Sequence, residues 1–337
     1  MFEALALTAR AASTPPTWES VQLSQLQSGE LLVAIKACGI CYTDLKAAHG
    51  QFHLKPPLIL GHEGVGIVEA AGEAAAKRFK SGEYVVLSLA YCGTCTLCQD
   101  GKPAYCSTSF DCNFKGTRTS DNSHVARAET DDLALHAQFF GQSAMSTRAV
   151  VRMECAIKTD AKDVNELESY AGLGCGFQTG CGVIMNVAKP TPQDVVIIFG
   201  CGAVGLSAIM AAALHSCLIV AVDTVPAKCT LALSVGATHA IDATTQNVTE
   251  EIRKLTKGKM ASFALDCVGN LQILQTAHDS LATLGTLITV GGVPNASPPF
   301  SIVSHILKGI RYIGTHQGDA NPPQRGEIAL RSTPHAI

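Results

Sequence analysis

The strongest chemical signal in the chain is a group of four closely spaced cysteines. The segment YCGTCTLCQDGKPAYC places Cys92, Cys95, Cys98 and Cys106 in a C-x2-C-x2-C-x7-C pattern. Thiolates at this spacing allow one loop to wrap around a single Zn²⁺ with tetrahedral geometry. Iron–sulfur clusters also take four cysteines, but the ferredoxin spacings differ from this one. Because protein fills all four coordination positions, we expect this zinc to stabilise the structure and not to react.

Three further segments carry residues that bind metals. They are ACGICYTDLK with Cys41, GHEGVG with His62 and Glu63, and GLGCGFQTGCG with Cys175. Taken singly, each residue is better explained without a metal, because a lone buried cysteine is more often a core residue and a lone histidine is more often bonded to a backbone carbonyl. Taken together, they offer two thiolates and one imidazole, which leave the fourth position of a tetrahedral zinc ion open. The sequence therefore predicts a second, catalytic zinc whose open position suits the oxygen of an alcohol.

A third signal is a glycine-rich turn that follows an apolar stretch. In VVIIFGCGAVGL, Gly200, Gly202 and Gly205 form the G-x-G-x-x-G pattern that lets a pyrophosphate approach backbone amides at a helix start. The next apolar stretch, LIVAV, is followed by Asp223, which lies about 20 residues after the glycine-rich turn. A ribose-binding acid is expected at this distance from the turn. A carboxylate there repels a 2′-phosphate, so the sequence favours NAD over NADP. An ordinary strand-to-helix turn is the alternative.

The elements that must position these residues change character along the chain. From Phe2 to about residue 155, short strand-like segments such as GELLVAIKACGI and GEYVVLSLA alternate with glycine, proline and polar clusters, which predicts a mostly β domain. From Asp163 onward, apolar strands such as DVVIIFG alternate with helical segments such as AVGLSAIMAAALH, which predicts a doubly wound parallel sheet. A chain of 337 residues is long enough for two such domains.

Composition argues against several classes of function. The 25 basic and 28 acidic residues leave a net charge of −3, so no nucleic-acid surface is indicated. The uncharged stretch between Asp194 and Asp223 has the length of a membrane span, but its glycines favour a strand, turn, helix and second strand. The start, MFEALALTAR, lacks a secretory signal pattern, and 14 cysteines without one favour metal binding over disulfides. We expect a cytoplasmic protein that acts on a small molecule.

Several motifs occur in the order found in one enzyme family. GICYTD, GHEGVG, the four-cysteine loop, GCGFQTG and GCGAVG resemble the zinc-dependent branch of the medium-chain dehydrogenase/reductase superfamily, over roughly residues 2–316. Within it, HAQFFGQS and LGCGFQTGCGVIMNVAKP look most like the aryl- and benzyl-alcohol dehydrogenase group. The resemblance implies an α/β protein with a GroES-like, mostly β catalytic domain over residues 1–176 and a Rossmann NAD-binding domain over 177–315. It implies hydride transfer between NAD and an alcohol, either aromatic or a larger biosynthetic intermediate, with two zinc ions per chain.

The same resemblance assigns roles around the catalytic zinc. It makes Cys41, His62 and Cys175 the ligands and Glu63 an acid able to approach the metal. It makes Asp44 the carboxylate that orients His62. A metal-binding imidazole needs its other nitrogen held by an acceptor, and Asp44, three residues after Cys41, is suited to this.

A proton relay is also implied, starting at Thr43, whose hydroxyl passes the proton of the alcohol to the cofactor ribose. In the family a histidine often continues this relay, but the matching residue here is Lys46. His49, three residues on, is more simply explained as a surface residue. Tyr42 replaces the basic side chain or histidine commonly found beside the metal ligand, and we expect Cys38 to serve only in packing.

Further expectations about the cofactor, the partner and the chain end rest on the resemblance alone. Lys228 falls where the family places a lysine near the adenosine ribose, and Thr179 matches a position against the nicotinamide. The strand near Arg311 to Thr315 and the preceding PNASPPF loop lie at the dimer contact in the family, so a homodimer is expected. Family members return to the first domain beyond RYIGTHQGD, and residues 316–337 are short for that return. A zinc-stabilised binding or scaffold protein with impaired catalysis is therefore the alternative.

Overall fold

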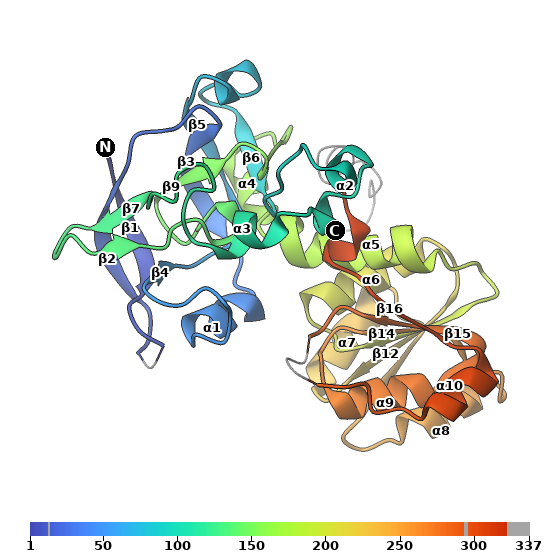
Figure 1. The fold of residues 1–337 in the computed structure, drawn as a ribbon. Helices are drawn as coiled ribbons and strands as arrows, with labels where there is room; N and C mark the ends of the chain where they lie inside the picture. The colour runs from blue at the N-terminus through green and yellow to red at the C-terminus, as the bar shows by residue number, and fades with distance from the viewer. Residues whose placement is uncertain (13, 293–295, 322–337) are drawn as a thin grey trace. The chain divides into compact units, whose positions relative to one another are not determined.

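A computed structural model describes residues 1–12, 14–292 and 296–321, and the chain falls into two compact units (Figure 1). The first unit contains Met1–Cys175 and the second is Gly176–Ala320. Most of the segment 316–337, for which we expect a return to the first domain, lies outside the described residues. Within the described ranges, no helix is both long enough and apolar enough to cross a membrane.

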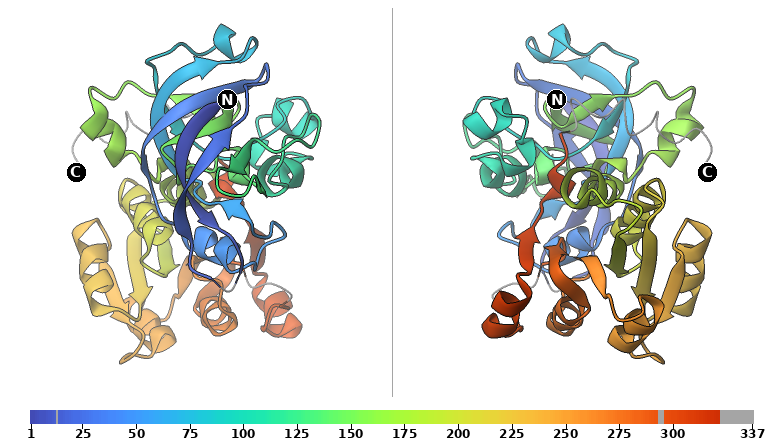
Figure 2. Two further views of the ribbon diagram at one scale, coloured as in Figure 1. Left: turned by 90° about the vertical axis from the view of Figure 1, so that its left-hand side faces the viewer. Right: turned by 90° about the vertical axis from the view of Figure 1, so that its right-hand side faces the viewer.

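Two five-stranded antiparallel sheets form the framework of the first unit. The strands of one sheet are β1 (Phe2–Ala9), β2 (Thr17–Leu23), β4 (Leu58–Ile59), β7 (Ala126–Ala128) and β8 (Ala134–Leu135). The strands of the other are β3 (Glu30–Cys38), β5 (Gly64–Ala71), β6 (Tyr84–Leu87), β9 (Arg148–Arg152) and β10 (Ala156–Lys158). Their orders are β4-β1-β2-β7-β8 and β10-β6-β5-β3-β9. Figure 2 shows the blue strands of this unit twisting around one another. The two sheets confirm the predicted mostly β domain.

Strand β3 is buried on both of its faces. Leu31 and Val33 pack into one hydrophobic core with Leu87, whereas Leu32 packs into another core with Val21. Neighbouring side chains of a strand point to opposite faces, so a run such as ELLVA serves two cores at once. The first half of β3 is thereby fixed in the core, and its mostly half-buried second half ends three residues before Cys41.

Short helices connect the strands of the first unit, and two of them contain a metal-type cysteine, Cys98 in one and Cys175 in the other. The α-helices are α1 (Tyr42–Ala48), α2 (Thr96–Gln99), α3 (Ser109–Phe114) and α4 (Val164–Ser169). The 3₁₀ turns are η1 (Ala75–Lys77), η2 (Pro103–Tyr105) and η3 (Phe139–Gly141), and the π-helical turn is η4 (Leu173–Phe177). Helix α1 begins immediately after Cys41, where the Asp44 side chain accepts a hydrogen bond from the Cys41 backbone N–H at 3.0 Å. This is the reciprocal capping that favours a helix start.

The second unit is a six-stranded sheet in which every pair of neighbours is parallel. Its strands are β11 (Val195–Phe199), β12 (Leu218–Asp223), β13 (His239–Asp242), β14 (Ala261–Asp266), β15 (Leu281–Thr289) and β16 (Arg311–Gly314). Their order is β13-β12-β11-β14-β15-β16, the doubly wound order of dinucleotide-binding folds. The helical elements are α5 (Gln178–Gly182), η5 (Val183–Ala188), α6 (Ala203–Ala213), α7 (Pro226–Ser234), α8 (Val248–Leu255), α9 (Leu271–Asp279), α10 (Ile302–Lys308) and η6 (Gln317–Asp319). The predicted doubly wound sheet is confirmed.

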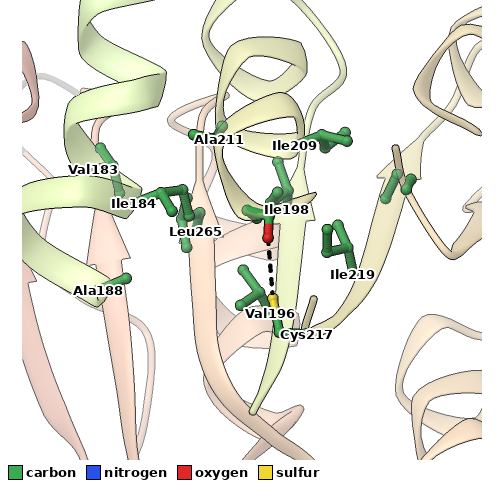
Figure 3. Close-up of a cluster of buried hydrophobic side chains, with 14 of the residues drawn as sticks. Val183, Ile184, Ala188, Val196, Ile198, Ile209, Ala211, Cys217, Ile219 and Leu265 are labelled. Atoms are coloured by element: carbon green, nitrogen blue, oxygen red, sulfur yellow. Dashed lines mark hydrogen bonds between the residues drawn. The ribbon is translucent and has the colours of Figure 1, made fainter. Parts of the chain in front are cut away.

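Helices cover both faces of this sheet, and the central strand β11 divides its side chains between them. Val196 and Ile198 pack with Ile209 of α6 (Figure 3). Ile197 packs on the opposite face with Leu274 of α9. A parallel strand buried on both sides is apolar at consecutive positions, which explains the run VVIIF. The uncharged stretch that includes it forms β11, α6 and β12, as predicted, and no membrane span.

Candidate metal and dinucleotide sites

Four predicted metal ligands converge within the first unit. The ligand atoms of Cys41, His62, Glu63 and Cys175, here called the mixed cluster, all lie within 4.8 Å of one another. Cys175 Sγ lies 3.4 Å from His62 Nε2. Sulfur and nitrogen ligands at two vertices of a tetrahedral zinc site are separated by about 3.5 Å. Two thiolates and an imidazole therefore fit a zinc ion both by chemistry and by spacing.

The ligands of the mixed cluster lie on short connections between regular elements. Cys41 lies between β3 and α1, and His62 lies between β4 and β5. Cys175 lies in η4, where the preceding residue, Gly174, packs against the backbone of Leu87 at the end of β6. A Cβ atom on Gly174 would collide with the Leu87 carbonyl oxygen. Glycine at this position is therefore what lets Cys175 approach the strand ends.

Asp44 fixes the orientation of the His62 ring. Its Oδ1 atom accepts hydrogen bonds from His62 Nδ1 and from the Gly61 backbone N–H, each at 3.0 Å. Asp44 and His62 are both only 1% exposed. Because Nδ1 donates to the carboxylate, Nε2 is the ring nitrogen that faces the thiols, and after loss of its proton this nitrogen can bind a metal.

Charge in the mixed cluster favours a cation. A hydrogen bond from Cys175 and a further one from His62, opposed by burial, lower the pKa of Cys41 to about 3. Burial disfavours the protonated His62 ring, but its hydrogen bonds with Asp44 and Cys41 outweigh this and raise its pKa to about 10. The thiolate is the metal-binding form of cysteine, and Cys41 is held in it at neutral pH. By contrast, burial raises the pKa of Cys38 to about 12, and this residue packs beside two hydrophobic cores.

Aromatic rings surround the His62 imidazole. It stacks on the Phe140 ring at a centroid distance of 4.5 Å and meets the edge of Phe139 at 5.5 Å. Phe140 in turn contacts Phe114 at 5.1 Å, and Phe114 contacts Phe110, which is half exposed. We call these rings, with Phe52 beside Phe114 and Phe139, the aromatic cluster. The four-residue spacing of Phe110 and Phe114 places both on one face of α3, a hint that the sequence contained.

Two buried polar residues near the mixed cluster carry no sequence signal that singles them out. Gln142 is fully buried, and its Nε2 atom donates to the carbonyl oxygens of His62 at 3.0 Å and Ser88 at 2.9 Å. Its Oε1 atom accepts from the Gly64 backbone N–H at 3.1 Å. The Ser88 hydroxyl donates to the Gly174 carbonyl oxygen at 2.7 Å. Both residues thus contact the backbone of segments that carry metal ligands.

A separate four-cysteine cluster forms between β6 and α3. The sulfur atoms of Cys92, Cys95, Cys98 and Cys106 lie within 4.8 Å of one another. Burial disfavours a thiolate at Cys92, but backbone N–H groups, including those of Thr94 at 3.5 Å and Cys95 at 3.3 Å, lower its pKa to about 5. Across the described residues, which include all 14 cysteines, no disulfide is formed. Four sulfur donors at these distances fit one tetrahedral zinc ion.

The residues discussed above for a proton relay, on the basis of the family resemblance, all lie on or beside α1. Thr43 is half-buried in its first turn, and its backbone N–H donates to the Cys41 thiol. The Lys46 ammonium lies 5.2 Å from the centroid of the Tyr42 ring. Exposed His49 ends the helix with its Nδ1 atom 2.8 Å from the carbonyl oxygen of the residue four positions earlier. Lys46 is therefore held against Tyr42, and His49 is held against the helix terminus.

The glycine-rich turn of the second unit joins β11 to α6. Gly200 has a φ of +91°, a conformation that favours glycine. A Cβ atom on Gly205 would collide with the Gly200 carbonyl oxygen, whereas one on Gly202 would meet no atom within 4 Å. Gly200 thus allows the tight turn, Gly202 leaves space for a pyrophosphate to approach, and Gly205 allows the helix to pack closely.

The other predicted cofactor residues also lie in the second unit. Asp223, at the end of β12, accepts a hydrogen bond from the Cys201 backbone N–H at 2.7 Å. Its second oxygen accepts from the backbone N–H groups of the next two residues at 2.8 and 3.0 Å. Lys228 is exposed in the first turn of α7. Thr179 is buried in α5, with its hydroxyl 3.3 Å from the Gln317 side-chain oxygen.

Comparisons with known proteins cover most of the chain. Residues 27–161 match the model of the alcohol dehydrogenase GroES-like domain, and residues 203–331 match that of the zinc-binding dehydrogenases. A probable alcohol dehydrogenase from Pseudomonas sp is 36% identical over 285 residues, which is 83% of this chain and 88% of that protein. A geraniol dehydrogenase from Castellaniella defragrans is 35% identical over 323 residues, 95% of this chain and 85% of that protein. The crystal structure of benzyl alcohol dehydrogenase from Acinetobacter calcoaceticus matches with a TM-score of 0.90 and 33% identity, covering 98% of this chain and 90% of that one.

Proposed function

The chain belongs to the zinc-dependent, medium-chain alcohol dehydrogenase family, and from this premise we propose that it transfers a hydride between an alcohol and NAD, giving the aldehyde or ketone. The observation that carries the proposal is the convergence of Cys41, His62 and Cys175, with the His62 tautomer fixed by Asp44. The relatives named above are alcohol dehydrogenases, which agrees with this chemistry. No observation on the described residues favours a scaffold protein over an enzyme.

We propose two zinc ions per chain with different tasks. One would be held by Cys41, His62 and Cys175, with Glu63 within reach, and would supply the Lewis acidity that lowers the pKa of a hydroxyl group. The other would be held by the four-cysteine cluster, where protein supplies every ligand, and would serve stability alone. Thiolate sites without disulfides suit a reducing compartment, in agreement with the cytoplasmic location that we expect from the sequence.

Within this proposal each side chain of the site has a task that follows from its position. Asp44 keeps His62 in its metal-binding tautomer through the 3.0 Å hydrogen bond. The task of Thr43, two residues after Cys41, depends instead on the family resemblance: its hydroxyl oxygen would accept the proton of the alcohol while its own proton passes to the cofactor ribose. The aromatic cluster around His62 keeps water from the apolar side of the imidazole. Removal of the proton and exclusion of water together favour loss of hydride from the carbon.

The substrate that we propose is a primary alcohol with an apolar, unsaturated group next to its hydroxymethyl carbon. Geraniol and benzyl alcohol, after which two relatives are named, both have this feature. The aromatic cluster offers matching chemistry, since rings such as Phe114 and Phe110 favour contact with flat, unsaturated groups. A saturated alcohol of similar size would lack the stacking part of this interaction.

NAD is the cofactor that we propose, bound at the Gly200-to-Gly205 turn. The open space at Gly202 suits a pyrophosphate, and the Asp223 carboxylate suits the hydroxyls of the adenosine ribose and repels a 2′-phosphate. Lys228 would lie near that ribose, and Thr179 near the nicotinamide. Both of these assignments depend on the family resemblance.

A homodimer is the assembly that we propose, formed through α10 and β16. Helix α10 has no buried residue, and Ile302, Ile306 and Leu307 are 75%, 69% and 78% exposed. Among the described residues, β16 is the outermost strand of its sheet, so its outer backbone groups can pair with another strand. Exposed apolar side chains and an open strand edge are both typical of a surface that a second subunit covers.

The decisive test measures zinc content and cofactor-linked turnover on the same preparation. We expect about two zinc ions per chain by mass spectrometry, and NADH absorbance that rises when benzyl alcohol or geraniol is added with NAD. A hexyl alcohol of similar mass serves as the saturated control and should turn over more slowly. One zinc per chain together with no binding of NAD would contradict the enzyme and support the scaffold alternative.

A further inference from the structure

We propose that Gln142 is a positioning residue that sets the placement of His62 relative to Cys175 and thereby the geometry of the catalytic metal site. The inference rests on the proposed function, because it concerns the metal that this function requires. Gln142 acts on backbone groups of the ligand-bearing segments through its side-chain amide. Its effect on the metal would therefore be transmitted through other residues.

The first step is that the Gln142 amide is held by three separate backbone groups. Its NH₂ group donates to His62 and Ser88 carbonyl oxygens, 80 and 54 positions away, and its oxygen accepts from Gly64. The side chain is fully buried. A buried donor or acceptor that loses its partner is destabilising, so all three bonds constrain the amide and the segments together. The backbone on either side of Glu63 is thereby tied to Ser88, the residue that follows β6.

The second step is that Ser88 continues this connection to the other ligand. Its hydroxyl donates at 2.7 Å to the carbonyl oxygen of Gly174, the residue before Cys175, and Ser88 is only 1% exposed. A path of hydrogen bonds therefore runs from His62 through Gln142 and Ser88 to the segment of Cys175. The two ligands are 113 positions apart in the sequence, and this path joins them without involving a metal.

The third step is the unusual backbone of the loop that carries Gln142. Phe140, Gly141 and Ser143 have φ values of +52°, +66° and +47°. Positive φ is uncommon for residues other than glycine, and such conformations concentrate at functional sites. The loop is braced by a 3.0 Å hydrogen bond from the Phe139 backbone N–H to the Ser143 hydroxyl. In this conformation the loop places the Phe140 ring on the His62 imidazole as well as the Gln142 amide on the His62 backbone.

The experiment compares two glutamine-to-methionine variants of the same loop in the full chain. Gln142→Met keeps the length and bulk of the side chain but removes all three hydrogen bonds. Gln138→Met is the matched control, because Gln138 is also buried, with 2% of its surface exposed, and its side chain donates to the Val150 carbonyl oxygen at 2.8 Å. Cobalt is substituted for the catalytic zinc, since its visible absorption reports coordination geometry, and loss of metal to a chelator is timed.

We expect Gln142→Met to alter the cobalt spectrum and to accelerate metal loss from this site by about 10- to 100-fold, the range known for residues behind metal ligands. The zinc of the four-cysteine cluster should be retained, and Gln138→Met should match the wild type in both measurements. A wild-type spectrum and rate in Gln142→Met would overturn the inference. So would equal effects of the two variants, because the loop would then matter only for general stability.

A second variant covers the case in which Gln142→Met does not fold. Ser88→Ala removes one hydroxyl from the same path, and we expect a smaller change of the cobalt spectrum and of metal loss in the same direction. Unchanged values in Ser88→Ala would then overturn the inference. A wild-type chain that holds zinc only in the four-cysteine cluster would instead contradict the proposed function, and the inference with it. The two failures are thus distinguished by the zinc content of the wild type.

Discussion

The four-cysteine cluster and the mixed cluster lie in the same unit, but they are assembled in different ways. In the former, the ligands Cys92 to Cys106 come from one loop, and backbone N–H groups of that loop stabilise the sulfur charge. In the latter, Cys41, His62 and Cys175 come from three distant segments, which are held by buried side chains such as Asp44. A local site depends on its own loop, whereas a distributed site depends on the packing of the whole unit. The two should therefore respond differently to mutation.

The largest expected effect comes from removing a ligand of the mixed cluster. His62→Ala should lower kcat by roughly a thousandfold or more, because Lewis acidity contributes several kcal/mol to the reaction. Zinc content should fall by about one ion, while that of the four-cysteine cluster is kept. Steady-state kinetics and mass spectrometry check both results, with exposed His239→Ala as the control. Loss of both ions in His62→Ala would show that the clusters are not independent.

Removing a ligand of the four-cysteine cluster should instead affect the stability of the fold. Cys98→Ser should lower the free energy of unfolding by at least about 3 kcal/mol, since structural zinc sites bind with about 10 to 16 kcal/mol in small domains. Turnover per folded molecule should change far less. Denaturant titration followed by kinetics on the soluble fraction tests this, and Cys112→Ser is the matched control, a buried cysteine outside the four. Unchanged unfolding in Cys98→Ser would remove the structural role of this cluster.

A third variant separates proton transfer from metal binding within the mixed cluster. Thr43→Ala should lower kcat by about 100-fold, the size of effect usual for one proton-transfer group. Both zinc ions should remain bound, because the contact from Thr43 to the Cys41 thiol is through its backbone N–H. Kinetics together with zinc analysis of the same sample provide the check. Near-normal turnover would exclude the Thr43 hydroxyl from the mechanism.

The smallest effect that we predict concerns Asp44, which supports a ligand of the mixed cluster without itself being a ligand. Asp44→Asn should weaken metal binding at the mixed cluster by about 10-fold, because the amide is a poorer acceptor for His62 and for two backbone N–H groups. Competition with a chelator measures the change. Asp266→Asn is the control, since Asp266 is equally buried and also accepts from backbone N–H groups, but lies in the second unit. Equal metal affinity in both variants would show that Asp44 does not support the site.

The contrast between the clusters also explains what could be predicted from the sequence. The spacing of Cys92, Cys95, Cys98 and Cys106 is sufficient to indicate a zinc loop, because all the geometry is local. Alternation of apolar strands and helices was likewise enough to predict the doubly wound sheet.

The residues that support the mixed cluster could not be predicted from the sequence, because their contacts are not local. Gln142 and Ser88 are ordinary polar residues in the sequence, and their partners lie tens of positions away. The packing of two sheets and their connections decides which buried amide donates to which carbonyl oxygen. Residue types alone do not predict this pairing. The positive φ of Phe140 is equally hidden, because the sequence points to the neighbouring Gly141 and not to a phenylalanine as the residue for such a conformation.

The three backbone hydrogen bonds of Asp223 have a consequence for how this protein can evolve. The carboxylate that we assign to cofactor choice also braces the glycine-rich turn through the Cys201 N–H and holds the start of the next segment. Any substitution that admits a 2′-phosphate by removing this carboxylate therefore also loosens the turn that receives the pyrophosphate. In a chain that uses NAD, as we propose, a change to NADP would therefore also cost stability in this turn, which a compensating mutation elsewhere would have to offset.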